Sequence, residues 1–475
     1  MAAPPSPRIF AGHRIREARR RLGLNQVQMA ARLGLSVSYL SQIENGDRPM
    51  TSAVVLAFAG AFPLEWAEVA PDDESAMLVS AVEAGTDPTI PDDALPEDLL
   101  RRAARQQPLL ARRLIAVHAA YRRSQDQLAA LDDNVASGAA ESAPMPWEEV
   151  RDWFHAAGNY VDALDRAAEA LHAAIADDGA PLAEAMARWM AERHGVRIDR
   201  SGTGASGEPI SRFDAARGCL TIDRSLPPES SAFLLAHQLA RLEMGETIAR
   251  IAGDARFRFG ESRALLAIGL ANYAAGALVM PYTAYRQAAR ETRHDIDRLR
   301  HRFGVSFEQA CHRLSTLQRP GLQGIPFFFC RVDMAGNITK RHSATRLQFA
   351  RFGGACPLWI VHEAVAIPDR ILVQLAELPE GSRYVSMAKG LVKSTGSYLR
   401  PARRYAVALG CEIAHAADFV YADQLELRGS GSATPIGISC RICPRAQCDQ
   451  RGFPPAGRAI MVDPDRRQTV PYRFA

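Results

Sequence analysis

Three cysteines near the end of the chain have the spacing of a metal-binding loop. Cys440, Cys443 and Cys448 fall within nine residues of a stretch that also contains glycine and proline. In a reducing compartment, thiols at such spacing are more often metal ligands than disulfide partners. Tetrahedral zinc and an iron–sulfur cubane each take four ligands, so a fourth is expected from elsewhere in the chain.

Three other cysteines are candidates for this fourth ligand. Cys356 lies between Gly354 and Pro357, at the mouth of a loop where a thiolate can turn outward, and we favour it. Cys411 lies in an apolar, helix-like run and Cys330 ends an aromatic strand, and such cysteines are more often plain core residues. A close trio with a distant fourth cysteine favours an iron–sulfur cluster, and zinc or no metal remain the alternatives.

A second group of residues has part of a hydrolytic zinc motif. That chemistry needs two histidines four residues apart on one helical face and a carboxylate that deprotonates water. His237 is present, but Gln238 and Arg241 occupy the other two positions. An amide cannot act as a general base and a guanidinium cannot ligate zinc, so we predict that the chain is not an enzyme. Glu243 and Glu246 could substitute, but a solvated helix face is the commoner explanation.

The positive charge of the chain is concentrated at its head. Residues 1–62 hold eight arginines against three acids, a net charge of +5, whereas the whole chain carries +4. A positive excess of this kind marks the place where a polyanion would dock. The head is therefore a candidate DNA-binding module.

The head also has the pattern of a helix-turn-helix. Asn25 and Ser36 suit the N-caps of helices over residues 26–33 and 37–44, and Gly34 supplies the left-handed turn between them. Basic and apolar helices are expected over residues 9–22 and 51–61. The second helix of the motif would enter a major groove, while flanking residues hold the phosphate backbone. The residues predicted to contact DNA are Gln26, Ser36, Val37, Ser38, Tyr39, Gln42, Asn45 and Arg48.

Composition and pattern predict a multidomain chain, mostly α, with an α+β C-terminal domain. We expect a helix-turn-helix domain over 1–66, an acidic linker and connecting helix over 67–146, a helical domain over 147–318 and a β-containing domain over 319–475. Residues 71–96 are expected to be loosely packed and 99–131 to form one helix. Residues 327–333, 357–365 and 384–392 are β-rich runs. No unbroken apolar run approaches the ~20 residues that span a bilayer, and the start lacks a secretory signal, so a cytoplasmic protein is expected.

Long stretches of the chain resemble known families. Residues 25–49 are similar to the phage-repressor-like (XRE) helix-turn-helix family, and 231–246 to the helix of the ImmA/IrrE metallopeptidase-like family. Leu270 stands where that family has its third ligand, so the middle domain resembles a retired protease scaffold. Residues 313–364, 409–425 and 440–455 resemble the C-terminal domain of the short-chain fatty acyl-CoA transcriptional regulators.

The last resemblance implies a regulator of propionate, acetate or related acyl-CoA metabolism that binds an operator as a dimer or tetramer. It also implies a [4Fe–4S] cluster held by Cys356, Cys440, Cys443 and Cys448, with zinc as the alternative, and an acyl-CoA effector. A redox- or iron-sensing regulator without acyl-CoA control, or a zinc metallopeptidase, are the rival functions. No effector-binding residue is assigned, although basic residues recur at Arg331, Lys340, Arg341, Arg346, Arg351, Lys389, Lys393, Arg400, Arg403 and Arg404.

Overall fold

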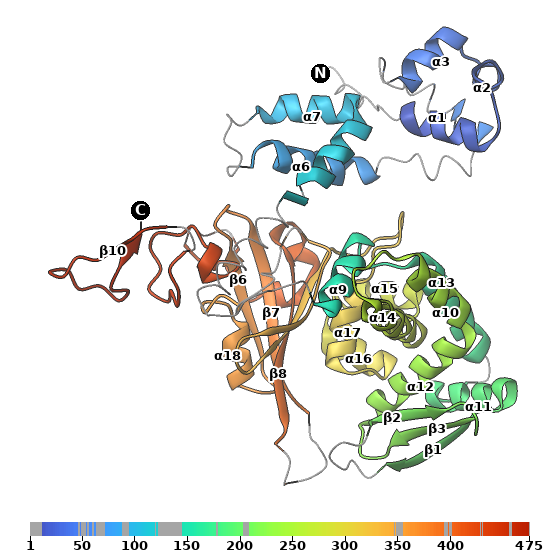
Figure 1. Ribbon diagram of the computed structural model, residues 1–475, viewed down its shortest axis with the longest axis vertical. Helices are drawn as coiled ribbons and strands as arrows, with labels where there is room; N and C mark the ends of the chain where they lie inside the picture. Colours follow the sequence, from blue (N-terminus) through green and yellow to red (C-terminus); the bar gives the residue numbers. More distant parts are fainter. Residues whose placement is uncertain are drawn as a thin grey trace. The chain divides into compact units, whose positions relative to one another are not determined.

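The computed structural model divides the chain into two compact units, Met1–Leu128 and Ala129–Ala475. It describes residues 12–45, 48, 54, 57, 58, 61, 62, 72–87, 95–118, 120, 121, 145–176, 179–202, 209–345, 347, 355–393, 398, 401–427, 429, 431–455 and 458–474. Parts of the helices expected over 9–22, 51–61 and 99–131 lie outside these ranges. Because the two units are separate bodies, each is described by itself (Figure 1).

The head of the first unit folds as the helix-turn-helix pattern predicts. It contains α1 (Gly12–Arg21), α2 (Gln26–Leu33) and α3 (Val37–Glu44). The Asn25 side chain accepts from the backbone of Gln28, the Ser36 side chain accepts from that of Tyr39, and Gly34 ends α2 in the left-handed conformation (φ 65°). The core beneath these helices includes Ile15, Ala18, Met29, Ala30, Leu33, Leu40, Ile43 and Phe58.

The segment that follows the head is more ordered than its acidic composition predicts. Its first half forms α6 (Asp72–Gly85) in place of the expected loose connection. Acidic residues in a first turn favour a helix N-terminus, and Leu78 and Ala81 bury their side chains in a small core with Ala104 and Ala111. The expected long helix is divided, since α7 (Glu97–Gln106) ends before Pro108, and Gln107 leaves helical geometry (φ −128°, ψ 63°). A proline disfavours helical conformation in the residue before it.

Helices make up most of the first half of the second unit. They pack around one large core in which helix residues and sheet residues are contiguous, from Phe154 to Ala422. The predicted boundary at 318/319 therefore falls between two elements that share a core. The helices are α9 (Pro146–Ala156), α10 (Asp162–Ile175), α11 (Leu182–His194), α12 (Pro228–Glu243), α13 (Gly245–Asp254), α14 (Gly260–Val279), α15 (Tyr282–Glu291), α16 (Ile296–Phe303) and α17 (Phe307–Leu314).

Helix α14 is long and apolar enough, by length and composition, to cross a membrane. No such segment was expected from the sequence. In the structure α14 is a core helix, because Leu266, Leu270, Ala274 and Leu278 are fully buried against the surrounding helices. Its apolar character is explained by this burial.

Three sheets belong to the described part of the second unit, and the smallest is the antiparallel pair of β10 (Ile460–Met461) and β11 (Arg473–Phe474). A three-stranded sheet has the order β1-β3-β2, with β1 (Arg197–Gly202), β2 (Ser211–Asp214) and β3 (Cys219–Asp223). A six-stranded, mostly antiparallel sheet has the order β5-β4-β8-β7-β6-β9. Its strands are β4 (Phe328–Asp333), β5 (Ile338–Ser343), β6 (Ile371–Glu377), β7 (Arg383–Lys393), β8 (Arg403–Glu412) and β9 (Thr434–Pro435). Short 3-10 helices η2 (Ile413–Asp418), η3 (Val420–Ala422) and η4 (Cys440–Ile442) follow the sheet or interrupt its loops.

Two of the three runs that were predicted to be β-rich form strands, β4 and β7, and the prediction for the third run is wrong. Residues 357–365 instead lead into the short helix α18 (Val361–Ala366), which covers one face of the large sheet with Val361 and Ala364. Cys411 lies in strand β8, not in a helix, and Cys330 lies within β4. A central strand buried on both faces has a continuous apolar run, which periodicity alone does not separate from a helix.

Candidate functional site

The predicted reading face of the head is open to solvent. Val37, Ser38 and Gln42 are exposed on α3, and Tyr39 is half-buried beneath the guanidinium of Arg48, which lies 5.9 Å from its ring centre. Short polar and apolar side chains at the start of such a helix can reach base edges in a major groove.

Three of the predicted DNA contacts are also held by other residues of the head. The Gln26 amide donates to Glu44 Oε2 at 3.0 Å, and the Asn45 side chain accepts from Arg16. Ser36 holds the N-cap of α3. In this arrangement Gln26 presents mainly its backbone N–H, at the N-terminus of α2, toward a phosphate.

Glu44 organises the head, and its role was not predicted from the sequence. Its side chain is fully buried and lies 2.7 Å from Arg19 Nε, while Arg16 lies 3.7 Å away. Burial alone would raise the pKa of Glu44, but the bonds from Arg19 and Gln26 and the two guanidinium charges outweigh it and lower the pKa. The available signal for this role was an acidic residue in a stretch rich in arginine. In the sequence, Glu44 was counted only toward the net charge of the head.

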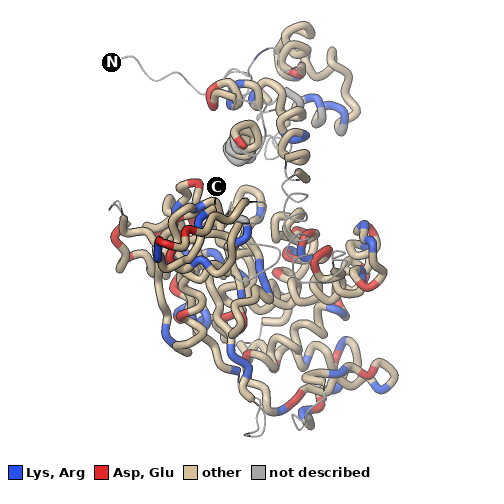
Figure 2. The backbone as a smooth tube through the Cα atoms, turned by 60° about the vertical axis from the view of Figure 1, so that its left-hand side comes forward, with Lys and Arg blue, Asp and Glu red and all other residues tan. Residues whose placement is uncertain are grey.

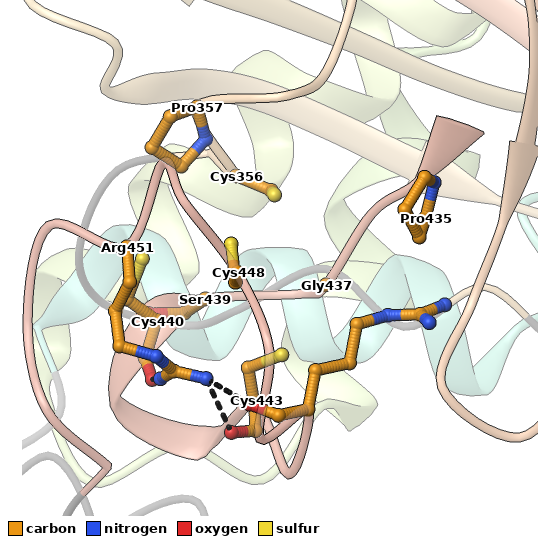
Figure 3. A pocket seen from close by; sticks show the side chains of 10 residues that line it. Cys356, Pro357, Pro435, Gly437, Ser439, Cys440, Cys443, Cys448 and Arg451 are labelled. Carbon is orange, nitrogen blue, oxygen red and sulfur yellow. Dashed lines mark hydrogen bonds between the residues drawn. The ribbon is translucent and has the colours of Figure 1, made fainter. Parts of the chain in front are cut away.

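The four cysteines predicted from spacing and resemblance line one pocket in the second unit. Cys356 comes from the segment before α18, and Cys440, Cys443 and Cys448 come from the loop that begins at η4 (Figure 3). The other lining residues are Pro357, Pro435, Gly437, Ser439, Arg445 and Arg451. All four thiols are free. The fold thus brings Cys356 together with three cysteines of which the nearest in sequence, Cys440, is 84 residues away.

Two arginines fix the backbone of this loop. Buried Arg451 donates through Nη1 to the Cys440 carbonyl at 3.1 Å and through Nη2 to the carbonyls of Cys443, at 3.5 Å, and Arg445. Arg445 in turn donates to the carbonyl of Glu377 in β6 at 2.8 Å. These bonds anchor the cysteine loop to the sheet.

Close packing at Gly437 leaves the thiol of Cys443 little room to move on that side of the pocket. A Cβ at Gly437 would lie 2.8 Å from Cys443 Sγ, so only glycine fits there without moving the thiol. Burial raises the pKa of Cys356 and the neighbouring Cys440 and Cys443 add to the effect, while backbone N–H groups of Gly437 and Leu358 act in the opposite direction. The Cys356 thiol therefore interacts electrostatically with Cys440 and Cys443.

The remaining candidate thiols do not line the pocket. Burial raises the pKa of Cys330 well above its usual value and that of Cys411 to about 12, and both are core residues of the large sheet. A protonated core thiol is a small hydrophobic residue. Among the residues that the structure describes, no three His, Cys, Asp or Glu side chains converge tightly enough to hold a metal ion as they stand.

The peptidase-like motif lies on α12. His237 Nε2 is buried and has no hydrogen-bond partner among the residues that the structure describes. Burial and then the charge of Arg241 lower the pKa of His237, so its ring is neutral. Leu270 on α14 is fully buried. Glu243 is not a solvated face residue, because it accepts from Trp189 Nε1 at 2.6 Å and contacts His194 Nε2 at 2.8 Å. Glu246 is exposed at the start of α13.

Several of the recurring basic residues gather around one buried carboxylate. Glu308 on α17 lies 2.9 Å from Lys340 Nζ, 3.1 Å from Lys393 Nζ and 3.2 Å from Arg331 Nη1. Burial would raise the pKa of Glu308, but these cations hold it far below its usual value. The lysines remain nearly half exposed, so this cationic cluster has more positive than negative charge facing solvent. Arg346, Arg351 and Arg400 lie outside the described residues. In Figure 2 the second unit otherwise mixes both signs.

Family models match the chain in the same order as its structural parts. Residues 15–69 match a helix-turn-helix, 191–315 an IrrE N-terminal-like domain and 316–472 the C-terminal domain of the short-chain fatty acyl coenzyme A regulators. The propionyl-CoA carboxylase regulator of Cereibacter sphaeroides is 46% identical over 98% of this chain and 99% of its own length. The chain belongs to the short-chain fatty acyl-CoA regulator family.

Other members of this family are similar over their whole length. The transcriptional regulators RamB and PrpR of Mycobacterium tuberculosis are 39% and 38% identical to this chain over 98% of it, covering 98% and 96% of their own lengths. A solved Mycobacterium tuberculosis transcriptional regulator has a TM-score of 0.66 and 42% identity, and covers 69% of this chain and 99% of its own. Relatives named as transcriptional regulators, with a helix-turn-helix head, make this chain a DNA-binding regulator.

Proposed function

We propose that this protein is a cytoplasmic, non-enzymatic transcription factor of short-chain acyl-CoA metabolism, whose paired heads bind an operator with an affinity set by acyl-CoA. The exposed α3 face carries this proposal, together with relatives named for propionyl-CoA carboxylase regulation. A ligand that prefers one arrangement of the paired heads changes DNA affinity by its differential affinity for the two states. Gln238, Arg241 and Leu270, at the positions of peptidase ligands and base, support a non-enzymatic middle.

A metal centre at the cysteine pocket is the second part of the proposal. Cys356, Cys440, Cys443 and Cys448 would hold it, and four sulfur donors without a histidine or carboxylate suit a [4Fe–4S] cluster, or else zinc. Such a cluster supplies a one-electron redox change. The chain itself contributes the Arg451 bonds that shape the loop and the backbone N–H groups of Gly437 and Leu358 beside Cys356.

The cationic cluster around Glu308 is our candidate for the effector's phosphates. Coenzyme A carries several phosphate groups, and charge-assisted bonds to them require cations that are not already fully neutralised. Lys340, Lys393 and Arg331 share one carboxylate, and the Tyr405 ring lies 5.3 Å from Lys393 Nζ. The excess positive charge of this cluster, beside the Tyr405 ring, supports its assignment to the effector's phosphates.

Operator binding is tested with duplexes selected from a random pool by the full chain. Gel-shift titrations of the selected duplex are then made with and without acetyl-, propionyl- and butyryl-CoA. We expect Gln42→Ala to weaken binding and at least one acyl-CoA to change the affinity of the wild type. If no C2–C4 acyl-CoA changes it, the effector part of the proposal is wrong.

The effector and metal parts are separated by variants. Lys393→Met is expected to raise the propionyl-CoA concentration needed for the effect, while Arg250→Met, at an exposed position of α13, serves as a matched control. Cys443→Ser is expected to lose bound iron and the absorbance near ~410 nm of an iron–sulfur centre. A wild type whose operator binding responds to redox state but never to acyl-CoA, with this response lost in Cys443→Ser, would instead favour the redox- or iron-sensing function.

A further inference from the structure

Strand β6 supports both halves of the cysteine pocket. The loop that carries three of the four cysteines is tied to the end of β6 by β9, which places Pro435 opposite Glu377, and by Arg445, which donates to the Glu377 carbonyl at 2.8 Å. Figure 3 shows Cys356 on the other side of the pocket from these three cysteines. Cys356 lies in a segment of turns, outside any strand, so other bonds must hold it.

The side chain of Gln374, on β6, makes two hydrogen bonds to the segment that follows Cys356. Its Nε2 donates to the Leu358 carbonyl at 2.9 Å, and its Oε1 accepts from the Ile360 backbone N–H at 3.1 Å. An amide side chain offers both donors and an acceptor, and here both ends bond the same short stretch of backbone. Gln374 therefore fixes residues 358–360 against the sheet.

A bond from the neighbouring strand holds the same segment. Ser386 on β7 lies directly opposite Gln374, and its hydroxyl accepts from Trp359 Nε1 at 3.1 Å. Ser386 is fully buried and Trp359 is buried. Directly opposed residues of an antiparallel pair share one face of the sheet, so both strands hold the segment from one face.

The segment held in this way contacts the sulfur of Cys356. The backbone N–H of Leu358 hydrogen-bonds this sulfur, as the N–H of Gly437 does from the cysteine loop. The Trp359 N–H donates to the Cys356 carbonyl at 2.9 Å. Hydrogen bonds to ligand sulfurs help to set the reduction potential of an iron–sulfur cluster, and residues behind the ligands orient them. Leu358 is thus the link between Gln374 and the pocket.

We propose that Gln374 is a positioning residue of the metal centre, which holds Leu358 so that Cys356 and its N–H···S bond face the other three cysteines. The inference rests on the proposed function, because it takes a metal centre at the cysteine pocket as its premise. A neutral side chain fixes this geometry without adding charge beside four sulfur donors. A carboxylate at position 374 could still accept from Ile360, but it would leave the Leu358 carbonyl without its donor.

Two substitutions in the full chain separate the two bonds. Gln374→Leu is close to glutamine in size and removes both, whereas Gln374→Glu keeps the acceptor for Ile360 and loses the donor to Leu358. Gln309→Leu is the matched control. The Gln309 side chain also bonds backbone, since it accepts from the Ser306 N–H at 2.7 Å in the cap of α17, and Gln309 does not line the cysteine pocket.

The first readout is metal retention and reduction potential, measured on anaerobically purified protein. In a titration with a chelator, Gln374→Leu and Gln374→Glu should lose iron or zinc at a chelator concentration roughly tenfold or more below that of the wild type. An iron–sulfur centre in Gln374→Leu should also have a lower reduction potential, because a weakened N–H···S bond disfavours the more negative, reduced state. Gln309→Leu should match the wild type in both measurements.

The second readout does not depend on bound metal. Hydrogen–deuterium exchange of the chelator-treated proteins is followed by mass spectrometry of their peptides. Amides of residues 356–360 should exchange roughly fivefold faster or more in Gln374→Leu, because the loss of bonds to buried groups favours local opening. Residues 440–448 should keep the wild-type rates, and Gln309→Leu should change neither segment.

Several outcomes would overturn the proposal. It is wrong if Gln374→Leu retains metal like the wild type with an unchanged potential, even with faster exchange at 356–360, because the segment is then anchored for the fold alone. Equal loss of metal in Gln309→Leu would also overturn it, since general destabilisation explains such a loss. A wild type that binds neither iron nor zinc would contradict the metal part of the proposed function, and faster exchange confined to 356–360 would still show that Gln374 holds Cys356.

Discussion

The guanidinium of Arg451 lies 4.7 Å from the ring centre of Phe474, and the same group holds the backbone of the cysteine loop. One buried side chain therefore contacts both the loop that carries Cys440 and Cys443 and the strand β11. A change in the conformation of the cysteine loop would move the Arg451 guanidinium, which lies over the Phe474 ring. This contact gives the cysteine pocket a physical route to strand β11.

Replacing Arg451 is expected to weaken the metal centre that we propose at the cysteine pocket. Arg451→Met removes the donors to the carbonyls of Cys440, Cys443 and Arg445, and leaving buried acceptors unpaired costs about 1–3 kcal/mol. Iron and zinc content per chain, measured on anaerobically purified protein, should fall. Arg458→Met removes a guanidinium from Phe474 without touching the loop, so its metal content should match the wild type. Equal metal content in both variants would contradict the role given to Arg451.

Glu44 is expected to stabilise the head in a pH-dependent way. Glu44→Gln keeps the shape but removes the charge that Arg19 faces, and should lower the free energy of unfolding of the head by about 1–3 kcal/mol. Because the pKa of Glu44 is lowered in the folded state, its contribution is present above the unfolded value of 4.5 and is lost as the pH falls below it.

Urea unfolding of the wild type and of Glu44→Gln between pH 4 and pH 7 checks this prediction. The difference between the two proteins should be largest near pH 7 and should shrink toward pH 4. A constant difference across this range would mean that Glu44 does not contribute through its charge. Glu97→Gln, in an exposed pair with Arg101, is a suitable control with little expected effect.

A buried histidine pair is expected to make the second unit sensitive to mild acid. His312 Nε2 and His342 Nε2 lie 3.2 Å apart, and His342 Nδ1 contacts Asn159 Oδ1 at 3.0 Å. Burial lowers the pKa of His312 well below its usual value, and burial followed by the charge of Lys340 lowers that of His342 to about 4.

Both rings are therefore neutral in the folded protein, whereas in the unfolded chain they gain protons below pH 6.5. Their stabilising effect is present above pH 6.5 and is lost as the pH falls, by about 1 kcal/mol per pH unit for each ring. Thermal unfolding followed from pH 7 to pH 5 should show a falling midpoint, and His342→Asn should reduce the slope. A slope unchanged in this variant would contradict the assignment.

Removal of His237 is expected to leave the metal content unchanged. The residues at the other positions of the peptidase motif, Gln238, Arg241 and Leu270, supply no ligand. His237→Ala protein should therefore contain as much iron and zinc as the wild type and should bind the operator normally. Zinc that disappears with this substitution would revive the metallopeptidase function. The Cys443→Ser protein, which is expected to lose its bound iron, is analysed for metal at the same time as the comparison.

Much of the candidate site followed from local patterns. The caps at Asn25 and Ser36 and the turn at Gly34 are set by neighbouring residues, so the helix-turn-helix could be predicted from the sequence. The three close cysteines follow from the same kind of short-range spacing. Helix α6 was missed because the acidic composition of residues 71–96 outweighed local signals that favour a helix, and the break before Pro108 was missed because the amphipathic pattern over 99–131 outweighed the proline.

The sequence by itself determined the order of the parts, the caps of the head, and which side chains could bind DNA or a metal. Only the tertiary structure decided which distant groups meet: Glu44 with Arg19, Glu308 with Lys340 and Lys393, and Arg451 with Phe474. It also decided that residues 357–365 lead into a helix while Cys411 lies in a strand. Caps and turns depend on neighbouring residues, whereas buried charges and apolar runs take their meaning from the elements packed against them.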